Sequence, residues 1–382
     1  MPAPRLAKTS LRGAGLAPKQ SPPSAEIASA QTAGLAMTYW WAFSGEISVQ
    51  PREIILANIE HKNPPRPGLT FDRGRINDML GVGLIPHGYQ QRRWTEGRLE
   101  YYDDEWGNLW VRMVGGSLKG EIFKPAIEDW RQLADLRPPD YTHPDCAAHM
   151  NAIFAMPTDK FKLAHIGGWI FDNARYLRKM EVYFADMALY PDELHRLHAI
   201  VARVYEQKIH LAGQAGADGI MIGEDMGTQT GLLFSPKMFR FYFKEMYARL
   251  FSIAHDYGMK VLMHSCGQNW AIVPDLLEAG VDVFQFDQPA LYDMPKLAAL
   301  LRERKAALWS PVDIQKILPT GDRQLIEVGA RQMIDLFEGG LICKNYGDLA
   351  GIGVKEEWDM WAYHAICARV GVDPLSAQRI ES

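Results

Sequence analysis

Short apolar runs alternate with longer segments of helical periodicity through the second half of the chain. The runs have the length of buried strands and lie at residues 163–166, 219–222, 260–263, 281–286, 307–309 and 340–343. The segments between them gather apolar residues on one helical face, at residues 192–213, 236–257, 270–279, 294–303, 323–337 and 354–370. Three of these helices end at Gly258, Gly280 or Gly339, as helices often do. The alternation predicts a parallel sheet with helices packed against it.

The first half of the chain adds a helix, a strand and an insertion. Residues 51–59 begin with proline and carry apolar residues on one helical face, and residues 68–71 form the next strand. Between about residues 89 and 114, polar and aromatic residues alternate, which predicts an antiparallel hairpin turning at 103–107. We count seven to eight strand–helix units, the barrel number. The predicted fold class is α/β, a (β/α)8 TIM barrel with a small β-hairpin insertion near its N-terminal part.

The N-terminal segment differs from the rest of the chain. Residues 1–36 are rich in Ala, Pro, Ser and Gly, so we expect a disordered extension there. We expect Met37 to begin the functional protein and residues 37–382 to form a single barrel domain. No Gly-x-Gly-x-x-Gly motif follows the first strand, so a dinucleotide-binding fold has little support.

Composition and charge narrow the class of protein. The chain has 382 residues, is 47% hydrophobic and carries a net charge of -5, with no basic block that would bind nucleic acid. No apolar run is long enough for a membrane helix. The four cysteines are widely spaced and do not resemble a disulfide framework, which favours a reducing cytoplasm. We therefore expect a soluble, cytoplasmic enzyme that acts on a small molecule.

A histidine and a cysteine stand where a strand meets its loop. His264 and Cys266 follow the run 260–263, and period-two geometry can direct both side chains to one side. A third ligand from another strand end would complete an N/S/S set suited to zinc, with one position open for catalysis. Cys343 closes another apolar run and is the candidate for that ligand. Cys146 and Cys367 are interpreted as structural.

Two acidic residues end the strand that precedes His264. In a βα-barrel the active site lies at the carboxyl ends of the strands, where Glu224 and Asp225 join His264, Cys266 and Cys343. Taken singly, a cysteine or histidine is more often a buried core residue than a ligand. Their joint placement at strand ends favours a metal site. The loop after Asp225 could close over substrate or could serve only as a connector.

The order of several short motifs resembles the uroporphyrinogen decarboxylase superfamily, and within it the corrinoid-dependent methyltransferase branch. The motifs are Pro51-Arg52-Glu53 with Pro64-Pro65-Arg66-Pro67, Asp103-Asp104-Glu105-Trp106-Gly107, Gly223-Glu224-Asp225-Met226-Gly227-Thr228-Gln229, Ser235-Pro236-Lys237-Met238-Phe239, His264-Ser265-Cys266-Gly267, Trp309-Ser310-Pro311-Val312-Asp313 and Gly339-Gly340-Leu341-Ile342-Cys343. The resemblance covers about residues 51–367.

The resemblance implies a zinc-dependent methyltransferase. The methyltransferase branch binds zinc through a His-x-Cys pair and a distant cysteine, and the two cysteines are 77 residues apart here (343 − 266). True uroporphyrinogen decarboxylases use no metal and carry an Arg-x-x-Gly-Arg segment, of which this chain has only Asp72-Arg73-Gly74-Arg75. That departure favours methyl transfer over decarboxylation.

The expected reaction moves a methyl group between a small methylated substrate, a methyl ether or a thiol, and a corrinoid carried by a partner protein. On this hypothesis His264, Cys266 and Cys343 bind Zn2+. Glu224 or Asp225 is catalytic and supplies a proton, orients the substrate or adds a fourth ligand. The residues expected to bind substrate are Arg73, Arg75 and Gln229.

Two alternatives stay open. One is a decarboxylase of a tetrapyrrole substrate, in which Arg73 and Arg75 clamp carboxylates and no metal is needed. The other is a non-catalytic barrel with a structural zinc, which would need four protein ligands. A homodimer is compatible with the sequence, which does not determine the oligomeric state.

Overall fold

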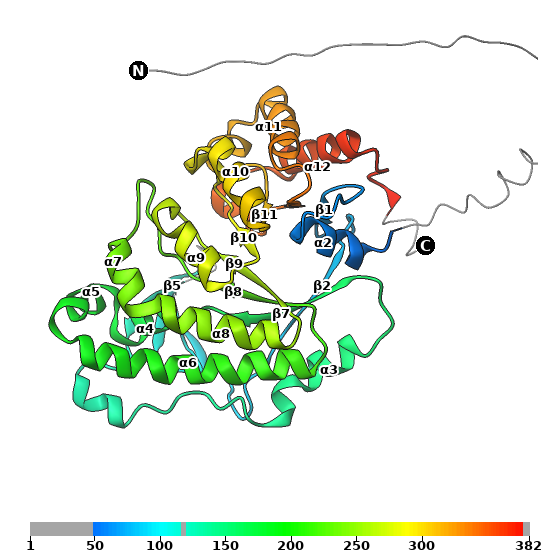
Figure 1. The fold of residues 1–382 in the computed structure, drawn as a ribbon. Coiled ribbons are helices and arrows are strands. Elements are labelled where there is room, and N and C mark those ends of the chain that lie inside the picture. The colour runs from blue at the N-terminus through cyan, green and yellow to red at the C-terminus, as the bar shows by residue number, and fades with distance from the viewer. Residues whose placement is uncertain (1–48, 116–119, 377–382) are drawn as a thin grey trace, which may run out of the picture. The chain divides into compact units, whose positions relative to one another are not determined.

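The computed structural model describes residues 49–115 and 120–376 (Figure 1). The extension expected over residues 1–36, and the first residues of the expected domain, lie outside this range. Among the described residues, no helix has both the length and the apolar character needed to cross a membrane.

Eight parallel strands form a nearly closed barrel. Their order around the sheet is β1-β12-β11-β10-β9-β8-β7-β2, so from β2 onward each barrel strand pairs with the next one along the chain, and β12 pairs with β1. Their bounds are β1 Gly68–Thr70, β2 Met79–Gly83, β7 Phe161–Gly167, β8 Gly219–Gly223, β9 Lys260–His264, β10 Val283–Gln285, β11 Ala307–Ser310 and β12 Leu341–Lys344. The predicted (β/α)8 TIM barrel is confirmed, and all eight carboxyl ends meet at one rim.

The barrel has a seam between β1 and β2. The two strands are not paired with each other: an isolated antiparallel bridge links Thr70 of β1 to Asn77, which precedes β2, and residues 71–78 connect the strands without a helix. The buried carboxylate of Asp78 closes the seam: it accepts hydrogen bonds from both terminal nitrogens of Arg66, at 2.6 and 2.8 Å, and from the Leu69 amide at 2.8 Å. A bidentate charged pair thus replaces the missing strand ladder.

Helices cover the outside of the sheet (Figure 1). Their bounds are α2 Pro51–Ile59, α3 Ala148–Phe154, α4 Ile170–Arg178, α5 Met180–Leu189, α6 Pro191–Gln214, α7 Pro236–Phe239, α8 Glu245–Asp256, α9 Val273–Ala279, α10 Met294–Arg304, α11 Arg323–Leu336 and α12 Glu356–Val370. The helix predicted over 236–257 is α7 and α8 joined by a π-helical turn at Arg240–Lys244. The predicted helices from 192 onward are therefore confirmed to within a few residues.

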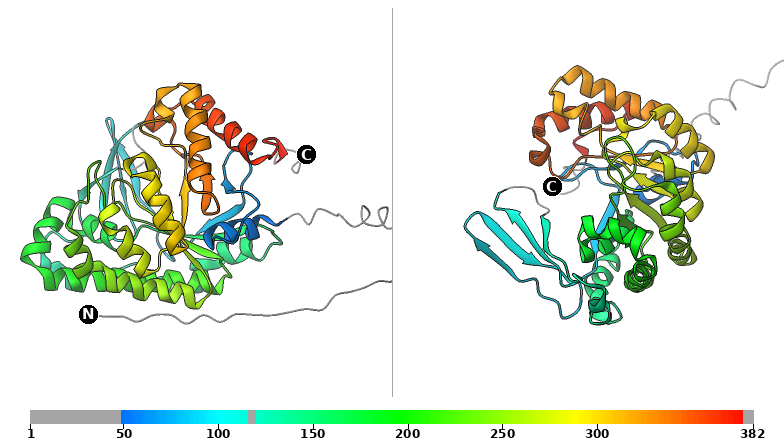
Figure 2. Two further views of the ribbon diagram at one scale, coloured as in Figure 1. Left: turned by 45° about the horizontal axis from the view of Figure 1, so that its top comes forward. Right: turned by 90° about the vertical axis from the view of Figure 1, so that its left-hand side faces the viewer.

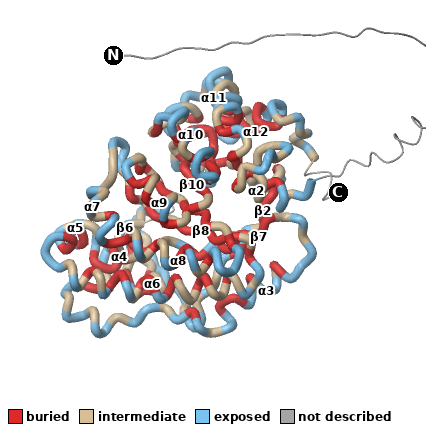
Figure 3. The backbone as a smooth tube through the Cα atoms, viewed as in Figure 1, coloured by how far each residue is buried: buried red, intermediate tan, exposed pale blue. Residues whose placement is uncertain are grey.

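Two hydrophobic layers lie on the two faces of the barrel strands. The inner cluster includes Phe161, Leu163, Leu262 and Ile342, and the larger outer cluster fills the space between strands and helices. Figure 3 shows this burial concentrated along the strands and the inner helix faces. Because both faces are largely buried, the strands are mainly apolar and do not alternate between apolar and polar residues.

The insertion is a sheet of its own. Its four antiparallel strands are β3 Arg93–Glu96, β4 Leu99–Asp103, β5 Leu109–Met113 and β6 Glu121–Lys124, and Figure 2 shows them in cyan as a layer beside the barrel. The predicted hairpin is confirmed as β4 and β5, but β3 and β6 extend it on both sides. The β4–β5 turn faces the rim formed by the carboxyl ends of the barrel strands, where it lines a cavity described below.

Candidate active site and metal centre

Three donor atoms gather at the carboxyl ends of β8 and β9. The Nε2 of His264 lies 3.4 Å from Oδ1 of Asp225 and 3.4 Å from Sγ of Cys266. The same Asp225 oxygen accepts a hydrogen bond of 2.9 Å from the Cys266 amide, which fixes the carboxylate beside the thiol. All three donor atoms lie within 4.8 Å of one another. Asp225, His264 and Cys266 together are called the donor set below.

A chain of hydrogen bonds sets the orientation of His264. The Gln285 amide nitrogen donates to Asp287 at 2.7 Å, and because a carboxylate can only accept, the Gln285 oxygen must face Nδ1 of His264, at 2.6 Å. Nδ1 therefore carries a hydrogen, and Nε2 is the nitrogen that faces Asp225 and Cys266. Lys344 supports the chain from β12, with its Nζ 3.2 Å from Asp287. This is how second-layer groups orient a metal-binding histidine.

The surroundings of His264 favour a positive charge. Burial lowers the pKa of His264, but its hydrogen bonds with Asp225 and Cys266 and the charges of Cys266 and Asp287 outweigh burial and raise that pKa well above its usual range. A proton satisfies this preference in the protein alone. A metal cation bound to the same nitrogen would satisfy it equally, so the donor set fits a cation.

Two glycines allow the loops that carry the donor set to touch. A side chain at Gly227 would place its Cβ 2.7 Å from the backbone carbon of Gly267, and a Cβ at Gly267 would collide with the Gly227 backbone. Gly267 also has a φ of 82°, which favours glycine. The Gln268 amide donates to the Thr228 carbonyl at 2.8 Å. The loop after β8 is therefore held against the loop after β9, which brings Asp225 to Cys266.

A cavity of about 790 Å³ opens above the donor set. The insertion contributes Tyr102, Asp104, Glu105, Trp106 and Trp110, and the barrel contributes Gly167, Gly168, Asp172, Asn173, Tyr176, Tyr205, Lys208, Gly223, Glu224, Asp225, His264, Cys266, Asp287 and Tyr346. Three glycines and many aromatic side chains thus shape the space. The cavity has the size expected of a small-molecule site.

An ion pair joins the insertion to the cavity wall. Nζ of Lys208 lies 3.3 Å from Glu105 and stands 4.3 Å from the ring centre of Tyr141, which itself donates a hydrogen bond of 2.6 Å to Glu105. Burial lowers the pKa of Lys208, and Glu105 partly offsets that shift. Sequence reasoning missed Lys208 because it lies within the long helix α6 with no motif around it. Glu105 was part of a family landmark, but without a role.

Glu224 is fully buried and both its oxygens are engaged. Oε2 accepts from the amides of Phe171 at 2.7 Å and Asp172 at 3.3 Å, and Oε1 accepts from the hydroxyl of Tyr247. Burial raises the pKa of Glu224 well above its usual range, and the charge of Asp172 adds to the shift. Glu224 therefore caps the first turn of α4. Of the two acidic residues predicted to be catalytic, only Asp225 lies beside His264.

Cys343 points away from the donor set. It is fully buried in the outer core between β12 and the helices, whereas its neighbours Ile342 and Lys344 face the barrel interior and the cavity side. Burial, and then the charge of Cys367, raise the pKa of the Cys343 thiol far above its usual range. The structure does not bring Cys343 to His264 and Cys266. Asp225 lies beside them instead, so the donor atoms that the structure brings together are an oxygen, a nitrogen and a sulfur.

The predicted substrate-binding residues do not line this cavity. Arg75 is buried in ion pairs with Asp359 at 2.6 Å and Asp72 at 3.2 Å. Arg73 is half-exposed and pairs with Glu356 at 3.0 Å. Gln229 lies exposed in the loop after β8. The two arginines thus hold the segment after β1 to α12, which is a structural role.

One comparison with known proteins identifies a family. A family model described as uroporphyrinogen decarboxylase (URO-D) matches residues 110–343, which is 234 of the 382 residues. A methyltransferase from Methanosarcina mazei has a similar structure, with a TM-score of 0.53 and 15% identity over 88% of this chain and 89% of that one. A B12-independent methionine synthase from Shewanella sp. W3-18-1 is more distant, with a TM-score of 0.40 and 13% identity over 62% and 68% of the two chains.

No curated protein matches the chain significantly. At 15% identity, the likeness to the Methanosarcina methyltransferase concerns the fold alone. The family model is the stronger finding because it covers more than half of the sequence, from the insertion to β12. The chain belongs to the uroporphyrinogen decarboxylase family.

Proposed function

We propose that this protein is a zinc-dependent methyltransferase that moves a methyl group between a small methyl ether or thiol and a corrinoid on a partner protein. The observation that carries the proposal is the donor set at the bottom of the cavity, with His264 fixed in the tautomer that a metal needs. The family and the likeness to a methyltransferase fold support the same reading.

The donor set fits zinc. Carboxylate oxygen, imidazole nitrogen and thiolate sulfur are all common zinc ligands, and three protein ligands leave a position for substrate. Asp225, His264 and Cys266 would hold the ion. When bound there, zinc supplies Lewis acidity that polarises the heteroatom donating or accepting the methyl group.

The protein's own residues would position the substrate and exclude water. Tyr102, Trp106 and Trp110 form apolar walls that come from the insertion, and Gly167, Gly168 and Gly223 leave room beside the donor set. The buried Lys208 and Glu105 offer hydrogen-bonding groups at the same wall. A flat substrate could stack on these aromatic side chains with its reacting heteroatom at Cys266 and His264.

The decarboxylase alternative has less support. A tetrapyrrole substrate carries several carboxylates, and the arginines expected to clamp them are engaged in ion pairs away from the cavity. Among the described residues, no arginine lines the cavity, and its lysine, Lys208, is already paired with Glu105. The cavity therefore offers little positive charge to a polycarboxylate. A structural zinc would need a fourth protein donor, and the cluster found among the described residues offers three.

Metal analysis tests the proposal first. Purified protein should contain about one zinc per chain, Cys266→Ala should lose it, and Cys343→Ala should keep it because that side chain lies on the other face of β12. Loss of zinc from Cys343→Ala alone would restore the ligand set expected from the sequence. Zinc missing from the wild-type protein and not taken up on addition would sink the proposal.

A cobalt assay tests the reaction itself. Zinc-loaded protein is incubated with free or methylated corrinoid and with thiols or methoxylated aromatic compounds, and the cobalt absorption is followed. We expect a change of the corrinoid spectrum with one partner class, absent in Cys266→Ala. An unchanged spectrum with every partner, in protein that does hold zinc, would count against methyl transfer.

We also propose a cytoplasmic location, since all four cysteines are unpaired.

A further inference from the structure

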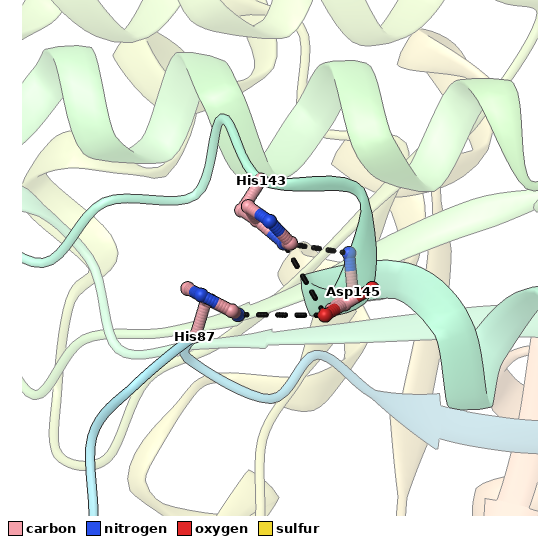
Figure 4. A group of neighbouring side chains, drawn as sticks. All are labelled: His87, His143 and Asp145. Atoms are coloured by element: carbon pink, nitrogen blue, oxygen red, sulfur yellow. Dashed lines mark hydrogen bonds and ion pairs between the residues drawn. The ribbon is translucent and has the colours of Figure 1, made fainter.

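Two histidines and an aspartate converge at the base of the insertion, away from the donor set. His87 follows β2, and His143 and Asp145 immediately precede α3. Nδ1 of His87 lies 3.6 Å, and Nδ1 of His143 lies 3.5 Å, from the same Asp145 oxygen (Figure 4). One donor atom from each residue lies within 4.8 Å of the other two. These three residues are called the neck site.

The neck site brings donor atoms of three side chains close together. The Asp145 amide donates a hydrogen bond of 3.2 Å to Nδ1 of His143, so that nitrogen carries no hydrogen of its own. The same nitrogen lies 3.5 Å from an oxygen of the Asp145 carboxylate, which carries lone pairs of its own. The two imidazole rings are stacked, with centroids 3.6 Å apart and planes 16° from parallel. A cation between these groups would relieve the repulsion between the lone pairs.

A second carboxylate strengthens the negative potential there. The pKa of Asp140 is lowered first by hydrogen bonds from Thr142, and further by the nearby charges of His143 and His87. Asp140 is therefore ionised at neutral pH and close enough to act on both imidazoles. Two imidazoles and a carboxylate form an N/N/O set that divalent ions such as Zn2+, Ni2+ and Co2+ prefer.

The neck site lies where the insertion leaves and rejoins the barrel. The insertion departs after β2 ends at Gly83 and returns before α3 begins at Ala148, and the Ile85 amide already donates to the Cys146 carbonyl at 3.1 Å. His87 and His143 are 56 residues apart in sequence (143 − 87). A metal ion that joins them closes this long loop, which is where cross-links stabilise a chain most in theory.

We propose that His87, His143 and Asp145 form a second divalent transition-metal site, independent of the donor set, which clips the insertion to the barrel. The three side chains are each at least two-fifths exposed, so an ion can reach them. An ion bound to Nδ1 of His143 would replace the exposed hydrogen bond that this nitrogen accepts from the Asp145 amide. The insertion carries walls of the active-site cavity, so the clip also steadies Asp104 and Glu105.

Cobalt titration of the whole protein separates the two sites. Co2+ bound by a thiolate gives an intense near-ultraviolet charge-transfer band, whereas Co2+ in an N/N/O site does not. We expect wild-type protein to bind two Co2+ equivalents by equilibrium dialysis, only one of which adds to that band. The double variant His87→Ala with His143→Ala should no longer bind the Co2+ ion that gives no thiolate band. Cys266→Ala should no longer bind the Co2+ ion that gives the band.

His149→Ala is the matched control, because His149 is an exposed histidine on α3 outside the cluster. It should keep both equivalents. Metal should raise the thermal midpoint of Cys266→Ala, but not that of Cys266→Ala with His87→Ala and His143→Ala. The neck site is disproved if the double histidine variant binds as many ions as wild type. If wild-type protein binds Co2+ without developing the thiolate band, the donor set is refuted and the neck site stands.

Discussion

At the scale of single residues, the orientation of the His264 imidazole decides which ring nitrogen faces Asp225 and Cys266. His264 and Cys266 could be placed at a strand end from the sequence, because an apolar run followed by a loop marks that position. The partner that fixes the tautomer, Gln285, could not be predicted, since it belongs to the next strand and its contact depends on the register of β9 with β10. The pairing of β9 with β10 therefore decides which ring nitrogen of His264 is held by Gln285.

Replacing Gln285 tests this dependence. Gln285→Leu keeps the volume of the side chain but removes the acceptor for Nδ1 of His264 and the donor to Asp287. We expect zinc affinity to fall about 10–100-fold, the usual effect of losing a group that orients a metal ligand. Competition with a chelator measures it. Gln324→Leu, at an exposed helix start, is the control and should leave the affinity unchanged.

The orientation of Cys343 could not be read from the sequence. In a strand with one face in water, polar residues reveal which side chains point inward. Leu341, Ile342 and Cys343 are all buried, so their order along β12 carries no such information. The structure puts Ile342 into the barrel and Cys343 behind it. Asp225 could be found as a candidate from its strand end, but its place as the third donor could not.

At the scale of elements, predictions from periodicity succeeded best where a helix has one buried face. The long helices of the second half were predicted to within a few residues for that reason. The insertion was only half predicted: β4 and β5 carry partly buried aromatic and apolar residues, whereas all four residues of β3 are exposed. An exposed strand is defined by pairing rather than by burial.

The contact between the two active-site loops can be tested with matched glycines. Gly227→Ala would place a Cβ 2.7 Å from the Gly267 backbone, whereas Gly231, in the same loop, has no neighbour near its Cβ position. We expect Gly227→Ala to lower the free energy of unfolding by about 1–3 kcal/mol through overpacking and to weaken zinc binding by moving Asp225. Gly231→Ala should do neither. Urea unfolding and metal titration check both; equal behaviour of the two variants would contradict the loop contact.

The packing of α6 predicts a pH dependence. Burial, and secondly the charge of His195, lower the pKa of His198 to about 3, while its Nε2 lies 2.8 Å from the Tyr183 hydroxyl. An unfolded histidine titrates near about 6.5. Between about pH 3 and pH 6.5, this histidine binds a proton in the unfolded chain but not in the folded one. The free energy of unfolding therefore rises with pH over this range, and acidification destabilises the folded protein.

His198→Gln should remove that contribution. The wild-type protein should lose up to about 1.4 kcal/mol more stability per pH unit than the variant as the pH falls from 6 to 4. Urea unfolding at several pH values measures the two slopes. Parallel curves for the two proteins would mean that His198 is protonated in the folded state.

At the scale of the whole molecule, the barrel depends on its seam. Asp78→Ala would leave Arg66 without its bidentate partner and the Leu69 amide without an acceptor. Breaking a buried pair costs about 3–5 kcal/mol. Asp335→Ala removes an exposed partner of Arg369 and should cost at most about 1 kcal/mol. Denaturant unfolding of both variants compares them, and a similar small loss in each would show that the seam needs no ion pair.

The donor residues and part of the cavity wall are encoded in separate parts of the sequence. The donors lie at the end of β9 and on the loops after β8 and β9, whereas three aromatic wall residues, Tyr102, Trp106 and Trp110, come from one continuous segment between β2 and α3. Substitutions in that segment can reshape the cavity while the donors and their supporting hydrogen bonds keep their places. Relatives with one chemistry could therefore diverge in substrate by exchanging a single stretch of sequence, and a chimaera that swaps only this stretch would be expected to carry its substrate preference with it.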